Sequence, residues 1–236
     1  LFAFVILLVA GAYLIQQLQG RTWQMVVNGT QRVRWSHFFG GFAVWGVINV
    51  ISMAVGYVTD PGNFEFRFDA ARFIPLVAVT MIPIQSASEE FFFRGYLAQG
   101  VASWTGSRWW ALVVPSVLFG LMHAANPEVA QYGFWVMMPQ YILMGVAFGL
   151  AALLDDGIEV AMGAHAANNL CGALLTTYEG AAIQTDALFM VRELNPMADL
   201  PELILSGALF VGLLAYLYKW QFGVLRRPVP PPFKYV

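Results

Sequence analysis

Long apolar runs are the feature that most limits how this chain can fold. About seven runs contain few or no charged residues, and they fall near residues 1–18, 36–58, 73–103, 109–125, 131–154, 158–178 and 203–224. An apolar run of about 18 residues or more is typical of a helix that crosses the hydrocarbon core of a bilayer. Only 11% of the residues are charged, whereas soluble domains contain roughly 25%. We therefore predict an all-α, polytopic membrane bundle of about seven transmembrane helices, in a single domain that covers residues 1–236.

The distribution of basic residues predicts the orientation of this bundle. The connection 19–35 contains Arg21, Arg32 and Arg34 and no acidic residue, and the segment after Tyr218 contains four basic residues and no acidic one. By the positive-inside rule both segments should be cytoplasmic, and the even number of predicted crossings between them agrees. We expect a prokaryotic plasma membrane protein with a cytoplasmic C-terminus. Because the chain begins inside an apolar run, we also expect a native start upstream, with room for an eighth helix.

The charged and strongly polar side chains inside the predicted spans belong largely to one chemical set. Ionisable groups in a membrane span are costly and mark functional sites. The set consists of Glu89, Glu90, Arg94, His123, His165, Asn168 and Asn169, and His37 lies apart from it near an interface. Glu90 and Arg94 are four residues apart and can pair on one helix face, whereas Glu89 points about 100° away. The net charge of −2, with no basic stripe, excludes nucleic acid as a partner.

Hydrolysis is the chemistry that fits these residue types. Glu89 beside an imidazole can activate water as a general base, while the amide of Asn169 and an N–H of His165 can stabilise an oxyanion. Alternatively, Glu89, His123 and His165 can hold a divalent metal such as zinc, with an open position for water. The residues do not decide between these two mechanisms. The chain has neither a His-Glu-x-x-His nor a Gly-x-Ser-x-Gly motif, which excludes two common hydrolase types.

Local patterns predict several further features. Pro75 and Pro83 predict a kink or a break, after which the acidic pair would lie early in a helix over about 84–103 capped by Ser86 or Ser88. Small residues between Gly163 and Gly172 allow another helix to approach closely. Two adjacent acids, Asp155 and Asp156, precede Gly157 at a span end, which is more typical of a solvated loop.

Three short motifs resemble one protease family. Glu89-Glu90-x-x-x-Arg94, Phe119-x-x-x-His123 and His165-x-x-x-Asn169 are similar to the signature of the CPBP intramembrane proteases, also called CAAX prenyl protease, type II CAAX endopeptidase or Abi family. The resemblance covers about residues 75–175, the predicted motif-bearing core. It implies an all-helical intramembrane endopeptidase whose site opens toward the cytosol.

The resemblance also implies roles for the motif residues. Glu89 would activate water with help from His123, His165 and Asn169 would serve the oxyanion or act as ligands, and Glu90 and Arg94 would support the site. Both a metal-dependent and a metal-free glutamate mechanism are compatible with it. It implies a membrane environment and a peptide or protein substrate, either prenylated or a bacteriocin or signal peptide.

Two other functions are compatible with the same residues. Buried Glu, His and Arg also build proton relays, so a proton- or ion-coupled transporter is an alternative. A non-catalytic bacteriocin-immunity membrane protein could keep the motifs for structure alone. At 1.5 Å per helical residue, the predicted span ends also place His165 about 10 Å nearer the cytoplasm than Glu89 and His123. Tilt or a misplaced boundary would have to close that difference in an enzyme.

Overall fold

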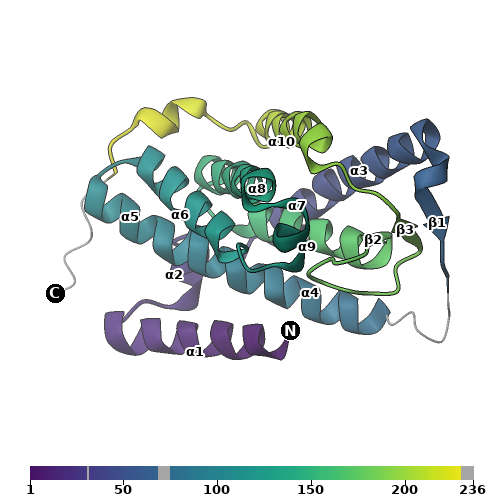
Figure 1. The fold of residues 1–236 in the computed structure, drawn as a ribbon. Coiled ribbons are helices and arrows are strands. Elements are labelled where there is room, and N and C mark those ends of the chain that lie inside the picture. Colours follow the sequence, from purple (N-terminus) through teal and green to yellow (C-terminus); the bar gives the residue numbers. More distant parts are fainter. Residues whose placement is uncertain (31, 69–74, 230–236) are drawn as a thin grey trace.

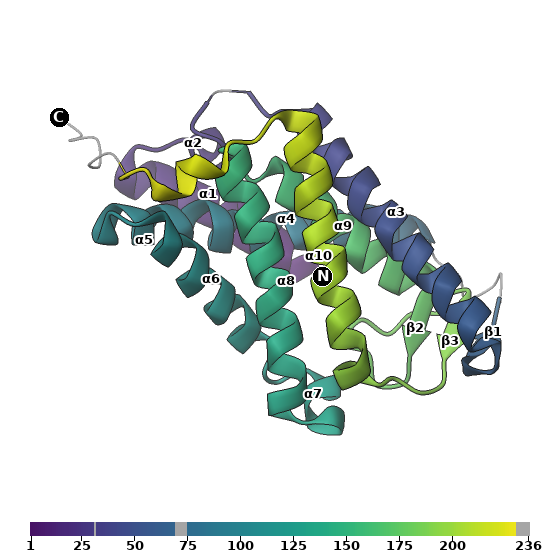
Figure 2. The same ribbon diagram turned by 90° about the horizontal axis from the view of Figure 1, so that it is seen from above.

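A computed structural model of the protein describes residues 1–30, 32–68 and 75–229, and it is a bundle of helices (Figures 1 and 2). The α-helices are α1 (Phe2–Gln19), α2 (Trp23–Val27), α3 (Trp35–Thr59), α4 (Pro75–Glu90), α5 (Ala98–Thr105), α6 (Arg108–Met122), α7 (Pro127–Tyr132), α8 (Phe134–Asp155), α9 (Glu159–Leu174) and α10 (Pro196–Tyr218). Every predicted span overlaps at least one of them. Within the described residues, α1, α3, α8 and α10 are long and apolar enough to cross a membrane, and α6 is a shorter apolar helix. The predicted all-α membrane bundle is confirmed, while the number of crossings stays a prediction.

Helix α9 lies at the centre of the bundle, packed against α3, α4 and α8. Ten of its residues are buried, and small side chains let the backbone of α3 come close. A Cβ atom added at Gly163 would lie 1.9 Å from the Phe38 carbonyl oxygen, and one added at Gly41 would lie 2.1 Å from that of Val160. The predicted close helix approach is therefore present, and α3 is the helix that makes it.

Residues 75–105 form one continuous helical rod, which corrects the predicted break. Helix α4 leads directly into the π-helical segment η2 (Phe91–Leu97), which leads into α5. Pro83 lies inside α4, and Ser86 and Ser88 are buried within the helix instead of capping it. The prediction failed because a proline removes only one hydrogen bond of the helix ladder, and packing against neighbouring helices holds the rod together.

A small sheet covers one end of the bundle (Figure 1). Strand β1 (Phe64–Phe66) pairs antiparallel with β3 (Phe189–Val191), with Glu65 opposite Met190, and β2 (Thr176–Tyr178) pairs parallel with β3 on its other side. The described residues also include two short 3-10 helices, η1 (Pro61–Asn63) before β1 and η3 (Phe222–Arg226) after α10. The predicted span 158–178 thus ends earlier, at Leu174, because the chain turns into the sheet.

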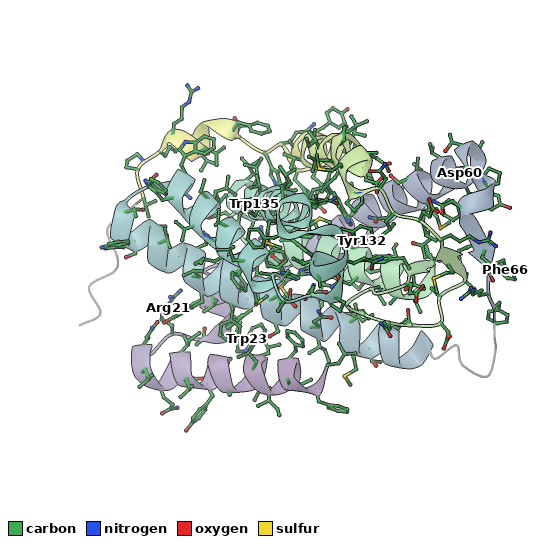
Figure 3. All side chains as sticks on the ribbon, viewed as in Figure 1. Arg21, Trp23, Asp60, Phe66, Tyr132 and Trp135 are labelled. Atoms are coloured by element: carbon green, nitrogen blue, oxygen red, sulfur yellow. The ribbon has the colours of Figure 1, made fainter. Side chains whose placement is uncertain are left out.

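Large apolar side chains point outward over much of the surface (Figure 3). Trp135 is 85% exposed and Phe66 65% exposed, and many exposed apolar residues belong to α1, α3 and α10. A soluble monomer rarely exposes contiguous apolar patches of more than a few hundred square ångströms. These faces therefore fit contact with lipid.

Candidate active site

The two acidic residues of the first motif end α4, and the arginine lies in the π-helical segment that follows. Single π-helical turns inside α-helices occur frequently at functional sites. Glu89, Glu90 and Arg94 are all buried, with at most 5% of each residue exposed. They lie near the middle of the rod 75–105, because the rod begins before Pro83 and not after it. This position brings the first motif level with the centre of α9.

Glu90 joins the first and third motifs. Its Oε1 atom accepts a hydrogen bond from Nη1 of Arg94 at 2.9 Å and lies 2.7 Å from Nδ1 of His165. The guanidinium of Arg94 also donates to the Gly145 carbonyl at 3.3 Å and lies 4.1 Å above the ring of Phe119. The predicted Glu90–Arg94 pair is thus present. It also anchors the imidazole of His165, a partner that sequence spacing did not predict.

Glu89 has one bonded and one free carboxylate oxygen. Oε1 accepts a hydrogen bond from Nε2 of Gln85 at 3.1 Å, whereas the buried Oε2 has no hydrogen-bond partner among the described residues. That free oxygen lies 3.8 Å from Nε2 of His165. Because Nδ1 of the imidazole faces Glu90, its Nε2 is the nitrogen that faces Glu89. A base and a ring nitrogen therefore lie side by side in a buried site.

His123 lies beside the pair formed by Glu89 and His165 and is not part of it. It follows the last residue of α6, and its Nδ1 is 2.8 Å from the Phe119 carbonyl oxygen. Its ring stacks on Tyr141 with centroids 4.5 Å apart. The Phe119 ring lies 4.7 Å from His123 and 5.8 Å from His165, and so contacts both imidazoles. In the described residues no hydrogen bond or ion pair joins His123 to Glu89, and His165 occupies the place beside that carboxylate.

Asn169 lies one helical turn beyond His165 on the same face of α9. Helices α4 and α9 run antiparallel here: His165 contacts Glu90, while Leu170 and Ala173 pack with Ile82. Asn169 is therefore level with the turn of α4 that leads up to Glu89. Its Oδ1 atom accepts a hydrogen bond from Nδ2 of Asn168 at 3.2 Å.

The first and third motifs thus meet at one level, and the second lies against them. The predicted spans had placed His165 nearer the cytoplasm than Glu89 and His123. The structure removes this difference, because the rod 75–105 is unbroken and Glu89 therefore lies in the middle of a helix and not at its start.

The metal site implied by the sequence is incomplete in this arrangement. Glu89 and His165 face each other with donor atoms 3.8 Å apart, and Glu90 holds the second nitrogen of the imidazole as an outer-shell carboxylate would. The third implied ligand, His123, is turned toward Tyr141 and the Phe119 carbonyl. No group of three His, Cys, Asp or Glu side chains suited to a metal occurs within the described ranges. The donor set does not fit a three-ligand metal centre.

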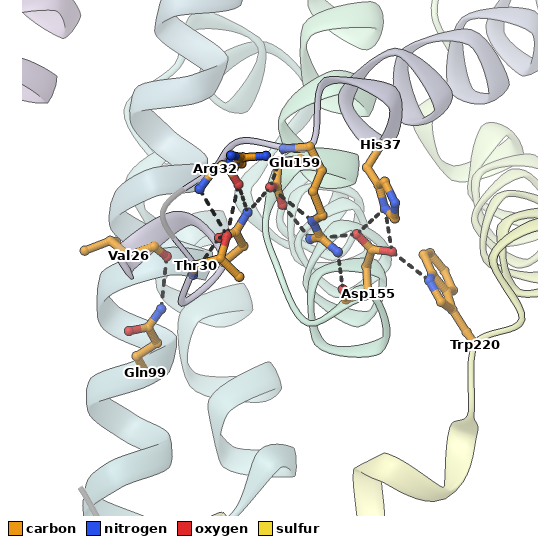
Figure 4. A network of polar contacts seen from close by, with 10 residues as sticks. Val26, Thr30, Arg32, His37, Gln99, Asp155, Glu159 and Trp220 are labelled. Atoms are coloured by element: carbon orange, nitrogen blue, oxygen red, sulfur yellow. Dashed lines mark hydrogen bonds and ion pairs between the residues drawn. The ribbon is translucent and has the colours of Figure 1, made fainter. Parts of the chain in front are cut away.

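A second buried polar network, which the sequence analysis missed, lies where α3 and α9 begin and α8 ends (Figure 4). Asp155 accepts a hydrogen bond from the Trp220 indole at 2.9 Å and lies 2.9 Å from Nδ1 of His37. Arg34 pairs with Asp155 at 3.0 Å and with Glu159 at 2.6 Å. The prediction that Asp155 belongs to a solvated loop is wrong, because these partners bury it. The sequence offered one signal for this network: Arg34 and Asp155 have opposite charges and lie at the ends of predicted spans on the same side of the membrane.

Comparison with known proteins agrees with the motifs. Residues 71–171 match the model of the family described as type II CAAX prenyl endopeptidase Rce1-like. The chain is also 29% identical over 203 residues to the uncharacterized protein YyaK of Bacillus subtilis (strain 168), an alignment that covers 84% of this chain and 68% of YyaK. No solved structure matches significantly. The matched segment contains all three motifs and every residue of the buried Glu–Arg–His cluster. The motif-bearing part of this chain is therefore similar to the Rce1-like family of type II CAAX prenyl endopeptidases.

Proposed function

We propose that this protein is an intramembrane endopeptidase that hydrolyses a peptide bond with a water molecule activated by Glu89. The observation that carries the proposal is the free Oε2 atom of Glu89, buried and 3.8 Å from Nε2 of His165. Atoms at that separation can both hydrogen-bond to one water molecule. A carboxylate and an imidazole that share a water are the parts of a general base site.

In the proposed reaction the water oxygen attacks the carbonyl carbon of the scissile bond while its proton passes to Oε2 of Glu89. The C–N bond then breaks, and the amine leaves with the proton that Glu89 returns to it. In this proposal the amide of Asn169 stabilises the oxyanion between these steps. His165 helps through Nε2–H when its ring is protonated, because Glu90 holds Nδ1.

The surrounding groups hold this base in position. Gln85 occupies one oxygen of Glu89 and leaves the other free. Glu90, paired with Arg94, holds His165 so that Nε2 stays directed at Glu89. A site that fixes its groups before the substrate arrives gains catalytic power through orientation. His123 would act at the edge of the site, on a substrate that enters beside Phe119 and Tyr141.

The substrate class follows from the family and is part of the proposal. A peptide with a prenylated C-terminal tail and a bacteriocin or signal peptide are the two candidates, and both would approach the site from the membrane. Cleavage of a peptide library with and without a prenyl group separates them.

The decisive experiment compares wild-type protein with Glu89→Gln in detergent or proteoliposomes. We expect Glu89→Gln to lower kcat by at least about 100-fold, because the amide cannot accept the water proton. Glu179→Gln, at an exposed position, is the matched control and should retain full activity. Because the donor set offers two facing ligands, we expect activity to survive a strong chelator. Loss with chelator and recovery with zinc would replace the glutamate mechanism by a metal-assisted one.

Retained cleavage in Glu89→Gln would overturn the proposal. Ion flux that depends on Glu89, without any cleavage by wild-type protein, would favour a transporter instead.

A further inference from the structure

A chain of hydrogen bonds runs from α3 through α9 to Asn169. The indole Nε1 of Trp45 donates to Oδ1 of Asn168 at 3.1 Å, and Nδ2 of Asn168 donates to Oδ1 of Asn169 at 3.2 Å. Trp45 is 2% exposed, and its ring packs edge-on against Phe148 and Phe210 with centroids 5.2 and 5.1 Å away. The indole of Trp45, the first donor in this series of hydrogen bonds, is therefore held in place by core packing.

The order of donors and acceptors in this chain is fixed by chemistry. An indole N–H can only donate, so the side chain of Asn168 must turn its oxygen toward Trp45. Its NH2 group then points at Asn169, which must present its own oxygen in return. The NH2 group of Asn169 is left without a partner among residues 1–30, 32–68 and 75–229. Asn169 is half-buried, so this donor remains open to a bound molecule.

That orientation matters for the proposed reaction. The two ends of an asparagine amide have nearly the same shape, so only the hydrogen-bond network decides which end faces the site. An oxyanion needs the NH2 end, because the carbonyl end would repel the negative charge that develops on the substrate oxygen.

We propose that Trp45 and Asn168 are positioning residues, which together hold the amide of Asn169 with its NH2 group toward the substrate oxyanion. This inference rests on the proposed function and assigns a task to two residues outside the three motifs. Asn168 is thus more than a helix-packing residue, and Trp45 acts on the reaction without touching the substrate.

The test is a double-mutant cycle in kcat. Trp45→Phe keeps the aromatic packing and removes the N–H, so Asn168 and then Asn169 lose their fixed orientation. We expect kcat to fall about 3- to 10-fold, the effect of one hydrogen bond, with KM unchanged because the substrate itself is not contacted. In an Asn169→Ala background, Trp45→Phe should cause no further fall in kcat, because the amide that Trp45 and Asn168 would orient is then absent.

Trp220→Phe is the matched control, since it also removes a buried indole N–H, but the one that donates to Asp155 at the other network. It should leave kcat unchanged even if its thermal stability falls. The inference is overturned if Trp45→Phe and Trp220→Phe lower kcat equally, or if Trp45→Phe and Asn169→Ala act additively. Failure of the proposed function is distinguishable, because Glu89→Gln would then retain activity in the same assay.

Discussion

Replacing Arg94 with methionine would test how strongly the Glu–Arg–His cluster holds the protein together. Arg94 is 5% exposed, and its guanidinium pairs with Glu90 at 2.9 Å and covers the Phe119 ring. Methionine keeps an unbranched chain of similar length but leaves Glu90 as a buried charge without its cation. Removing one partner of a buried ion pair typically costs about 3–5 kcal/mol. For a chain of this size that corresponds to a fall in Tm of roughly 6–20 °C.

The measurement is thermal unfolding in detergent of purified Arg94→Met, of Glu90→Gln and of the variant that combines the two substitutions. The double variant should be more stable than Arg94→Met alone, because both charges are then gone and the amide oxygen can still accept from His165. A fall in Tm of less than about 2 °C for Arg94→Met would refute the reasoning, as would a double variant whose loss equals the sum of the single losses. Either result would mean that Glu90 carries no uncompensated charge when its arginine is removed.

Two further predictions concern the packing and the second network, and unfolding in detergent checks both. Gly163→Val should lower Tm by about 10 °C, near the upper end of the cost of overpacking, or prevent stable folding, because any Cβ there would meet the Phe38 carbonyl at 1.9 Å. Gly172→Ala, with nothing within 4 Å of its Cβ, should be neutral, and equal effects would contradict the close-contact argument. Asp155→Asn should destabilise the protein by about 3–5 kcal/mol, because it breaks a buried charge network. The control Asp156→Asn, at the exposed neighbouring position, should change stability little. If Asp156→Asn were the more destabilising of the two, the network around Asp155 would not stabilise the fold.

The contrast between Glu89 and Glu90 shows how the structure separates two adjacent carboxylates. Both were candidates for chemistry by residue type. Glu90 accepts from a guanidinium and an imidazole through one oxygen, so its charge is committed to holding other groups. Glu89 keeps one oxygen free beside His165. Oε2 of Glu90 also has no partner among the described residues, but the free oxygen of Glu89 is the one that faces Nε2, the nitrogen of His165 that Glu90 does not hold. This position beside an unbonded ring nitrogen favours Glu89 as the proposed general base.

The sequence by itself determined the class of fold and the set of residues worth considering. Apolar runs of sufficient length must be helices in a bilayer, because no other structure satisfies the backbone without water. A fixed four-residue spacing places Glu90 beside Arg94 and His165 on the face of Asn169, since helix geometry is the same everywhere. Small residues on α9 likewise predicted a close neighbour.

Only the tertiary structure decided which of these residues meet. That His165, not His123, faces Glu89 depends on how the rod 75–105 lies against α9, which no local pattern encodes. The same holds for Asp155, whose partners come from positions 34, 37 and 220, and for the relay that begins at Trp45. Contacts between helices far apart in sequence depend on the packing of the whole bundle. Helix spacing and the family resemblance therefore indicated the separate roles of Glu89 and Glu90, whereas only the fold showed that His165 is the imidazole that contacts both.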